Sequence, residues 1–345
     1  MTTTATTPNP PPSDVPTDLA AEAARALRVE HWEPGAQRSA VGLDALGHAL
    51  SEPGVRHWVD LVDPSPALVR AVAAQLGLHP LVAEDIEERN QRPKLEVTDG
   101  HAHIVAFALE WSETDGILTH EIDIVLAERF LLTVHEAAWK PADGSHLRAG
   151  VAPLMEKGVD YLAWALLDEI VDGYFPVFDH VEDEIDTLED EIVSRASKDT
   201  LDRLFHLKRM LVDIRHVKGP QREIFNQLTN RTLPMISDEH VIYYRDIYDH
   251  AVHLSEDYDS FRDLVSGALD VYLSTVNNNL SQIMKRLTGI TVVLAGIGAF
   301  AGIFGMSEAG TAFAGLEAIG FWIVTFSIVG ASLGLLAILR RLDWL

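Results

Sequence analysis

Two histidine–glutamate dipeptides have residue types and a spacing that could support catalysis. His120-Glu121 and His135-Glu136 each match the start of H-E-x-x-H, a motif in which two histidines bind zinc and the glutamate acts as a general base. The positions where the second histidine would stand hold isoleucine and tryptophan. The chain also has no phosphate-binding glycine loop and no cysteine, which excludes thiolate metal sites, disulfides and thiol catalysis. We therefore expect a protein that is not an enzyme.

Carboxylates are the most abundant groups that could bind a metal. Asp and Glu number 52 against 27 Lys and Arg, and the formal net charge is -25. Most of the excess acid lies before residue 287. So acidic a surface argues against nucleic-acid binding. It fits cation binding, and it equally fits the plain solubility of an acidic domain.

Two uncharged apolar runs near the end of the chain predict a pair of transmembrane helices. They cover residues 287–304 and 321–339, and a helix needs about 17 to 25 such residues to cross a bilayer. Basic residues flank the pair at Lys285, Arg286, Arg340 and Arg341, whereas the loop between the runs has none. Basic flanks stay in the cytoplasm. We expect a multi-pass protein of the plasma or inner membrane, with both termini cytoplasmic.

Small residues in both runs indicate close helix packing. Gly298 and Gly302 form a G-x-x-x-G in the first run, and Gly330 and Gly334 form one in the second. This spacing lets helix backbones approach closely in lipid, although glycine is also simply common in membrane helices. Two helices alone cannot enclose a polar path, so we expect a homo-oligomer.

The elements before the hairpin indicate an α/β domain followed by helices. Residues 1–19 are rich in Thr and Pro and are expected to be disordered. Residues 20–152 predict an α/β domain with strands at 57–62, 102–109, 122–126 and 130–134. Helices are expected at 65–76 and 81–87, with Asp63 or Ser65 as the candidate cap of the first and Gly77 ending it.

Residues 153–286 predict a helical bundle and stalk before the hairpin at 287–345. One helix is expected over 161–193 with a kink at Pro176, and another over 199–228 with a kink or break at Gly219 and Pro220. After a candidate cap at Ser237, residues 238–304 lack proline and predict one helix of about 65 residues, on the order of 100 Å long. The fold class is an α+β membrane protein.

Several blocks in order resemble the CorA-type family of magnesium and divalent-cation transporters, over residues 55–345. They include HPLVAEDIEERNQRPKLE at 79–96, LLDEIVDGYFPV at 166–177, YYRDIYDH at 243–250 and FRDLVSGALDVYLSTV at 261–276. The resemblance implies a homopentamer in the lipid bilayer whose first membrane helix lines a pore. It implies transport of Mg²⁺, with Co²⁺ and Ni²⁺ as further candidates. Cytoplasmic divalent ions bound between subunits would hold the pore closed.

The resemblance also assigns roles to residues. The regulatory ligands between subunits would be Glu84, Asp85, Asp168 and Asp246, all acids, which suits a hard cation such as Mg²⁺. The basic flanks would form a collar at the inner mouth. The pore-lining positions would be Ser281, Met284, Leu287, Thr288, Thr291, Ala295 and Gly298. Among these, Met284 and Leu287 would form a constriction that excludes water.

The outer entrance departs from the family pattern. The family has Gly-Met-Asn after the first membrane helix, whereas this chain has Gly305, Met306 and Ser307. A ring of serine hydroxyls reaches less far than a ring of asparagine amides. A zinc-transporter-like or otherwise altered selectivity is therefore an alternative, and so is a membrane-anchored cation sensor that does not conduct.

Overall fold

A seven-stranded sheet forms the centre of the N-terminal part of the protein. The structure is a computed structural model that describes residues 17–51, 54–98, 100–114, 116–140, 150–305 and 317–341. Its strands are β1 Leu27–Glu33, β2 Ala36–Val41, β3 Arg56–Val62, β4 Lys94–Thr98, β5 His101–Ser112, β6 Gly116–Leu126 and β7 Phe130–His135. The predicted strands at 57–62, 102–109, 122–126 and 130–134 correspond to β3, β5, β6 and β7.

The strand order is β2-β1-β3-β7-β6-β5-β4. Every neighbouring pair is antiparallel except β3 and β7, which run parallel with Asp60 opposite Thr133. Side chains alternate between the two faces of a strand. In β3 the inward residues Val59 and Leu61 are fully buried, whereas Trp58, Asp60 and Val62 on the opposite face are half-buried. One face of β3 therefore packs in the core, whereas the other remains partly open to solvent.

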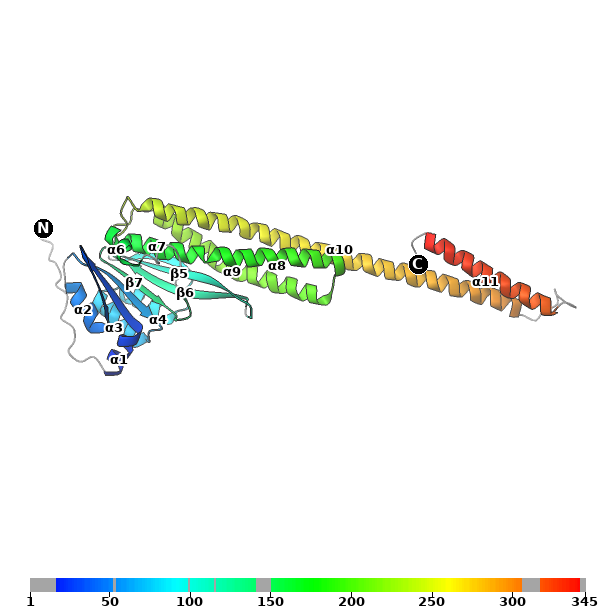
Figure 1. Cartoon of the computed structure of the whole chain (residues 1–345), viewed down its shortest axis with the longest axis horizontal. Coiled ribbons are helices and arrows are strands. Elements are labelled where there is room, and N and C mark those ends of the chain that lie inside the picture. Colours follow the sequence, from blue (N-terminus) through cyan, green and yellow to red (C-terminus); the bar gives the residue numbers. More distant parts are fainter. Residues whose placement is uncertain are drawn as a thin grey trace. The chain divides into compact units, whose positions relative to one another are not determined.

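Four helices cover one face of the sheet: α1 Thr17–Ala26, α2 Leu43–Ser51, α3 Pro66–Leu76 and α4 Pro80–Glu88 (Figure 1). A buried apolar cluster joins them to β1, β3, β6 and β7. Ser65 caps α3 by accepting the Leu68 N–H, as predicted, and Gly77 ends this helix at φ 68°. That left-handed conformation favours glycine, because it has no Cβ to clash.

The second face of the sheet contacts α7 Val159–Asp172, which follows the short helix α6 Ala152–Lys157. The predicted helix over 161–193 is two helices, since α8 Tyr174–Arg195 begins after Gly173. The expected kink at Pro176 was placed wrongly: the break is at Gly173. Pro176 lies in the first turn of α8. The backbone N–H that proline lacks would have no acceptor within the helix at this position.

Two further predictions are corrected, one about a break within a helix and one about where a helix begins. Helix α9 Lys198–Asn230 runs through Gly219 and Pro220 without a break. Helix α10 Val241–Gly305 is one helix of 65 residues, as expected, but it begins at Val241 and not at residue 238. Ser237 is therefore not its cap. The backbone N–H of Ser237 instead donates to Asp160 Oδ2 at 2.9 Å.

Asp160 links the starts of α7 and α10. Its carboxylate also lies 2.8 Å from His240 Nδ1, and the Tyr244 hydroxyl donates to its backbone oxygen at 2.6 Å. Both Asp160 and His240 are buried. A Cβ at position 158 would overlap Asp160 Oδ1, so glycine is needed there for close approach. This buried cluster replaces the cap that the sequence predicted at Ser237.

Contacts divide the chain into two compact units, Met1–Thr187 with Arg203–Val265, and Leu188–Asp202 with Ser266–Leu345. The second unit contains the last part of α10 and the helix α11 Glu317–Arg341. Within the described residues, α10 is the helix that is long and apolar enough to cross a membrane. Large apolar side chains of both helices are exposed, among them Leu294 at 63% and Phe326 at 67%. Such exposure is typical of surfaces that face lipid or other subunits.

Candidate metal centre

Three side chains from α7 and α10 form a group that could hold a metal ion. The ligand atoms of Asp168, Asp172 and His250 all lie within 4.8 Å of one another. His250 Nδ1 is 3.8 Å from Asp172 Oδ1. Asp168 is buried, whereas the other two side chains reach solvent. The group therefore has a fixed buried ligand and two that an ion can approach from water.

Helical spacing explains how these ligands come together. Asp168 and Asp172 are four residues apart on α7, and Asp246 and His250 are four apart on α10. Residues at this spacing share a helix face. The sequence prediction named Asp168 and Asp246 but missed Asp172 and His250. The same spacing, applied to the predicted acids, could have found both.

A second group surrounds Asp85 on α4. Ligand atoms of Asp85, Glu96 and His103 lie within 4.8 Å of one another. Lys94 Nζ is 2.5 Å from Asp85 Oδ2 and 3.4 Å from Glu96 Oε1. Burial lowers the pKa of this lysine, but the hydrogen bond to Asp85 and the charges of Glu96 and Asp85 outweigh it, and the pKa is raised overall. A cation bound by Asp85 must therefore displace the Lys94 ammonium or share the Asp85 carboxylate with it.

His103 is buried and paired with Asp123. Its Nε2 lies 2.8 Å from Asp123 Oδ1, and both side chains are at most 1% exposed. The imidazole is thus held in place by a carboxylate behind it. This arrangement is typical of a histidine whose orientation is fixed by a second partner.

Glu84 and Asp246 are exposed, on α4 and α10. In the described parts of the chain, no ion pair or hydrogen bond joins either to another of the four predicted regulatory acids. Both carboxylates are therefore accessible to a second subunit. Their predicted role between subunits stays a prediction.

Glu121, two residues from Asp123 on β6, has the most clearly shifted carboxyl pKa among the residues that the structure describes. Burial raises it to about 7, and the charge of Asp123 adds to the rise against the opposing effects of the Gln91 N–H and Arg89. The fold therefore favours the protonated form. Between its ordinary pKa of 4.5 and about 7, the folded state binds more protons than the unfolded state, so stability falls as pH rises through this window.

Replacing Glu121 with glutamine removes this penalty. We expect Glu121→Gln to be more stable than the native chain at about pH 8, by about 1 kcal/mol after allowance for solvent screening at this half-exposed site. The difference should vanish at about pH 4, below the ordinary pKa. Thermal unfolding at both pH values measures it, with the exposed Glu128→Gln as control. An equal effect at both pH values would contradict the assignment.

The predicted pore-lining residues lie on α10. All seven positions from Ser281 to Gly298 are exposed in the single chain, and their spacing of mostly three or four places them on one helix face. The Thr291 hydroxyl donates to the Leu287 carbonyl at 2.8 Å. Its oxygen lone pairs thus remain the groups that could meet a hydrated ion.

The ends of this face are only partly described. Gly305 is the last residue of α10, whereas Met306 and Ser307 lie outside the described residues. Lys285 and Arg286 are exposed on α10, and Arg340 and Arg341 end α11. The predicted entrance and basic collar therefore remain predictions.

Comparisons with known proteins agree with the resemblance seen in the sequence. A model of the family described as CorA-like Mg²⁺ transporter protein matches residues 55–341. The cobalt/magnesium transport protein CorA of Thermotoga maritima is 36% identical over 243 residues, which cover 70% of this chain and 69% of that protein. CorA of Methanocaldococcus jannaschii is 25% identical over 84% of this chain and 91% of that protein.

A solved structure shares the fold along nearly the whole chain. The complete structure of the CorA magnesium transporter from Methanocaldococcus jannaschii superposes with a TM-score of 0.77 at 23% identity, covering 93% of this chain and 99% of that chain. The fold and these matches define a membrane transporter of divalent cations. The chain belongs to the CorA-like Mg²⁺ transporter family.

Proposed function

We propose that this protein is a homopentameric channel that carries Mg²⁺, and also Co²⁺ or Ni²⁺, across the plasma or inner membrane. Divalent ions bound to its cytoplasmic acids would close it. Both termini would lie in the cytoplasm, as the basic flanks of the hairpin favour. The relatives named as cobalt/magnesium transport proteins support the choice of ions.

The observation that carries the proposal is the group formed by Asp168, Asp172 and His250. Two carboxylates offer hard oxygen ligands, which Mg²⁺ prefers while it keeps several of its waters. His250 stands on α10, the helix that also carries Met284 and Leu287. An ion held at this group would therefore contact the helix of the proposed gate directly.

Charge repulsion supplies an opening force. Without an ion, the acids Asp168 and Asp172 lie close together in one subunit, and Glu84 and Asp246 are exposed where a neighbour would add more acids. Like charges at such separations repel, more strongly where water is partly excluded. Loss of the ion would thus favour subunits moving apart, and ion binding would favour the closed state.

An altered ion preference has one observation in its favour. The group contains a histidine, and imidazole suits transition metals such as Ni²⁺ and Zn²⁺ better than Mg²⁺. Together with serine in place of the family's asparagine at the entrance, this keeps zinc or cobalt selectivity as a second candidate.

Flux into proteoliposomes tests the proposal. The purified full chain is reconstituted, and uptake of Mg²⁺, Co²⁺, Ni²⁺ and Zn²⁺ is measured with and without divalent ions on the cytoplasmic side. We expect Mg²⁺ uptake that millimolar internal Mg²⁺ suppresses. Uptake of Zn²⁺ alone would support the second candidate. No uptake of any ion, also after Ser307→Asn, would leave a sensor without a channel and overturn the proposal.

A further inference from the structure

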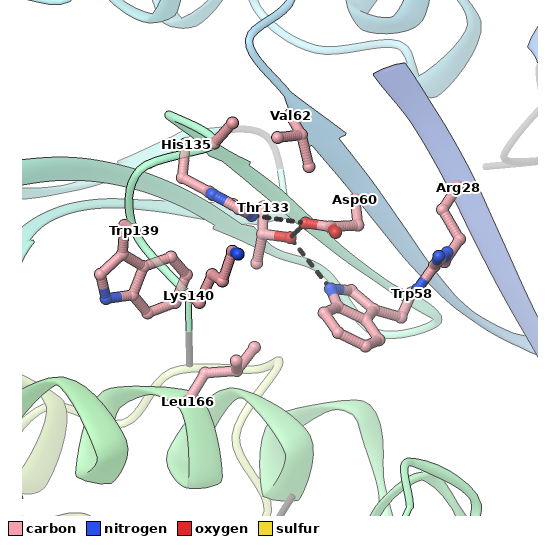
Figure 2. A pocket seen from close by; sticks show the side chains of 10 residues that line it. Arg28, Trp58, Asp60, Val62, Thr133, His135, Trp139, Lys140 and Leu166 are labelled. Carbon is pink, nitrogen blue, oxygen red and sulfur yellow. Dashed lines mark hydrogen bonds and ion pairs between the residues drawn. The ribbon is translucent and has the colours of Figure 1, made fainter. Parts of the chain in front are cut away.

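A mixed polar and aromatic cavity lies on the second face of the sheet, in the first unit, and none of its lining residues belongs to either metal group. Its volume is about 340 Å³, at the lower end of the range of about 300 to 1,000 Å³ for small-molecule sites. Side chains of β1, β3, β7 and the segment after β7 (Ala137, Trp139 and Lys140) line it together with Leu166 of α7 (Figure 2). None of the roles discussed above uses it.

The floor of the cavity is a chain of hydrogen-bonded groups, of which Thr133 and His135 are buried and Trp58 and Asp60 half-buried. The Trp58 indole N–H donates to Thr133 Oγ1 at 3.0 Å, and the Thr133 hydroxyl donates to Asp60 Oδ1 at 2.6 Å. His135 Nε2 lies 3.3 Å from the same carboxylate oxygen (Figure 2). Asp60 and Thr133 stand opposite each other on β3 and β7. The floor is therefore fixed before any ligand enters.

The charge of Asp60 is matched within this floor. Burial lowers the pKa of His135, but its hydrogen bond to Asp60 and the charge of that carboxylate outweigh burial and raise the pKa overall. The imidazole thus takes up a proton more readily than a free histidine, and with it the pair is neutral. When His135 carries this proton, a ligand above the floor does not face an uncompensated carboxylate.

Two cations stand at the cavity without a partner. Arg28 is next to Asp60 across the β1–β3 pairing, and Lys140 follows β7. Among the residues that the structure describes, no ion pair or hydrogen bond occupies the guanidinium of Arg28 or the ammonium of Lys140. On a chain of formal charge -25, two unpaired cations beside one cavity are unexpected for a surface that serves solubility alone.

Aromatic and apolar groups complete the walls. Trp139 is buried and packs edge-on against His135 at 4.8 Å between ring centroids, while Trp58 lines the opposite side. Leu166 closes the cavity from α7. Flat indole walls favour a flat ring, and the two cations favour a negative group attached to it.

We propose that this cavity is a binding site for a small organic anion that carries a flat ring, with Arg28 and Lys140 binding its negative group and Trp58 and Trp139 enclosing its ring. An aromatic carboxylate and a purine monophosphate both have this chemistry. They differ in the size of the ring and in the charge of the anion. Neither the proposed transport nor its control by divalent ions depends on this site.

Isothermal titration of the full chain in detergent tests it with matched probes. Benzoate and adenosine monophosphate are the anions, benzamide and adenosine their neutral counterparts, and inorganic phosphate the anion without a ring. We expect saturable binding of one anion, at least about tenfold tighter than its neutral counterpart and than phosphate. The neutral counterpart loses the charge-assisted hydrogen bonds, and phosphate loses the contacts of the ring with the indoles. Tighter binding of benzoate would identify an aromatic carboxylate as the ligand class, and tighter binding of adenosine monophosphate would identify a purine monophosphate.

The double variant Arg28→Gln/Lys140→Gln is expected to weaken that binding about tenfold or more. Both side chains are exposed, so the fold should be kept. The control Arg25→Gln/Lys208→Gln removes two exposed cations elsewhere and should change affinity less than about twofold. Binding of neither anion, neutral probes that bind equally well, or a double variant that binds like the native chain would each overturn the proposal.

Discussion

Replacing Asp160 with alanine is expected to lower the free energy of unfolding by about 3 to 5 kcal/mol, because it removes a buried carboxylate and leaves its hydrogen-bond partners unpaired. The side chains of Asp160 and His240 are only 9% and 6% exposed. The variant leaves His240 Nδ1 and the Ser237 N–H without their shared acceptor. Because these groups join α7 to the start of α10, the loss affects both helices.

Thermal unfolding of the full chain in detergent measures this effect, and a fall in Tm of about 10 °C is expected. The matched control is Asp257→Ala. Asp257 also pairs with a histidine, His253 at 3.6 Å, but on the exposed surface of α10. Exposed pairs contribute about 0 to 1 kcal/mol. A variant at position 160 that unfolds like this control would show that the buried cluster is not what holds the two helices together.

Replacing His250 with glutamine is expected to weaken Co²⁺ binding about 10- to 100-fold while changing Mg²⁺ binding less than about threefold. Imidazole nitrogen is a good ligand for late transition metals, whereas Mg²⁺ takes oxygen ligands and keeps its waters. The two carboxylates of the group stay in place in this variant. A much larger loss of Co²⁺ binding than of Mg²⁺ binding would therefore indicate that His250 binds the metal.

The readout is the ion concentration that gives half-maximal protection of the full chain from protease, measured for each ion. His253→Gln is the control, because His253 lies on the same helix but outside the metal group. We expect it to behave like the native chain with both ions. An equal loss for Co²⁺ and Mg²⁺ in His250→Gln would point to a structural role, and no loss would remove His250 from the ligands.

The strongly patterned elements could be predicted from the sequence, and the weakly patterned ones could not. Strands β5 to β7 are rich in buried apolar residues, and α3 carries its own capping signals at both ends. Strand β2 has no buried residue and β4 none either, so neither shows the alternation that identifies a strand. Tertiary pairing with β1 and β5 determines them.

The site was predictable only in part, for a physical reason. Asp85 and Asp168 are found through the family resemblance, since a lone acid in a sequence is usually a solvated one. The partners of Asp85 come from other elements: Lys94 and Glu96 from β4, and His103 from β5. The pairing of β4 with β5 brings Glu96 opposite His103. Local spacing cannot reveal a group that depends on the sheet.

The parallel pairing of β3 with β7 has a consequence for the order of folding. Each other strand pairs with one that lies nearby in the chain, but β3 ends at Val62 and its partner begins only at Phe130. Contacts that close long loops form late, so the antiparallel groups β2-β1-β3 and β7-β6-β5-β4 should form first and join at this seam last. Trp58, Asp60, Thr133 and His135 all stand at the seam, so the anion cavity exists only once it has closed. A ligand that binds there would act during biogenesis too, by holding together the last contact that the domain makes.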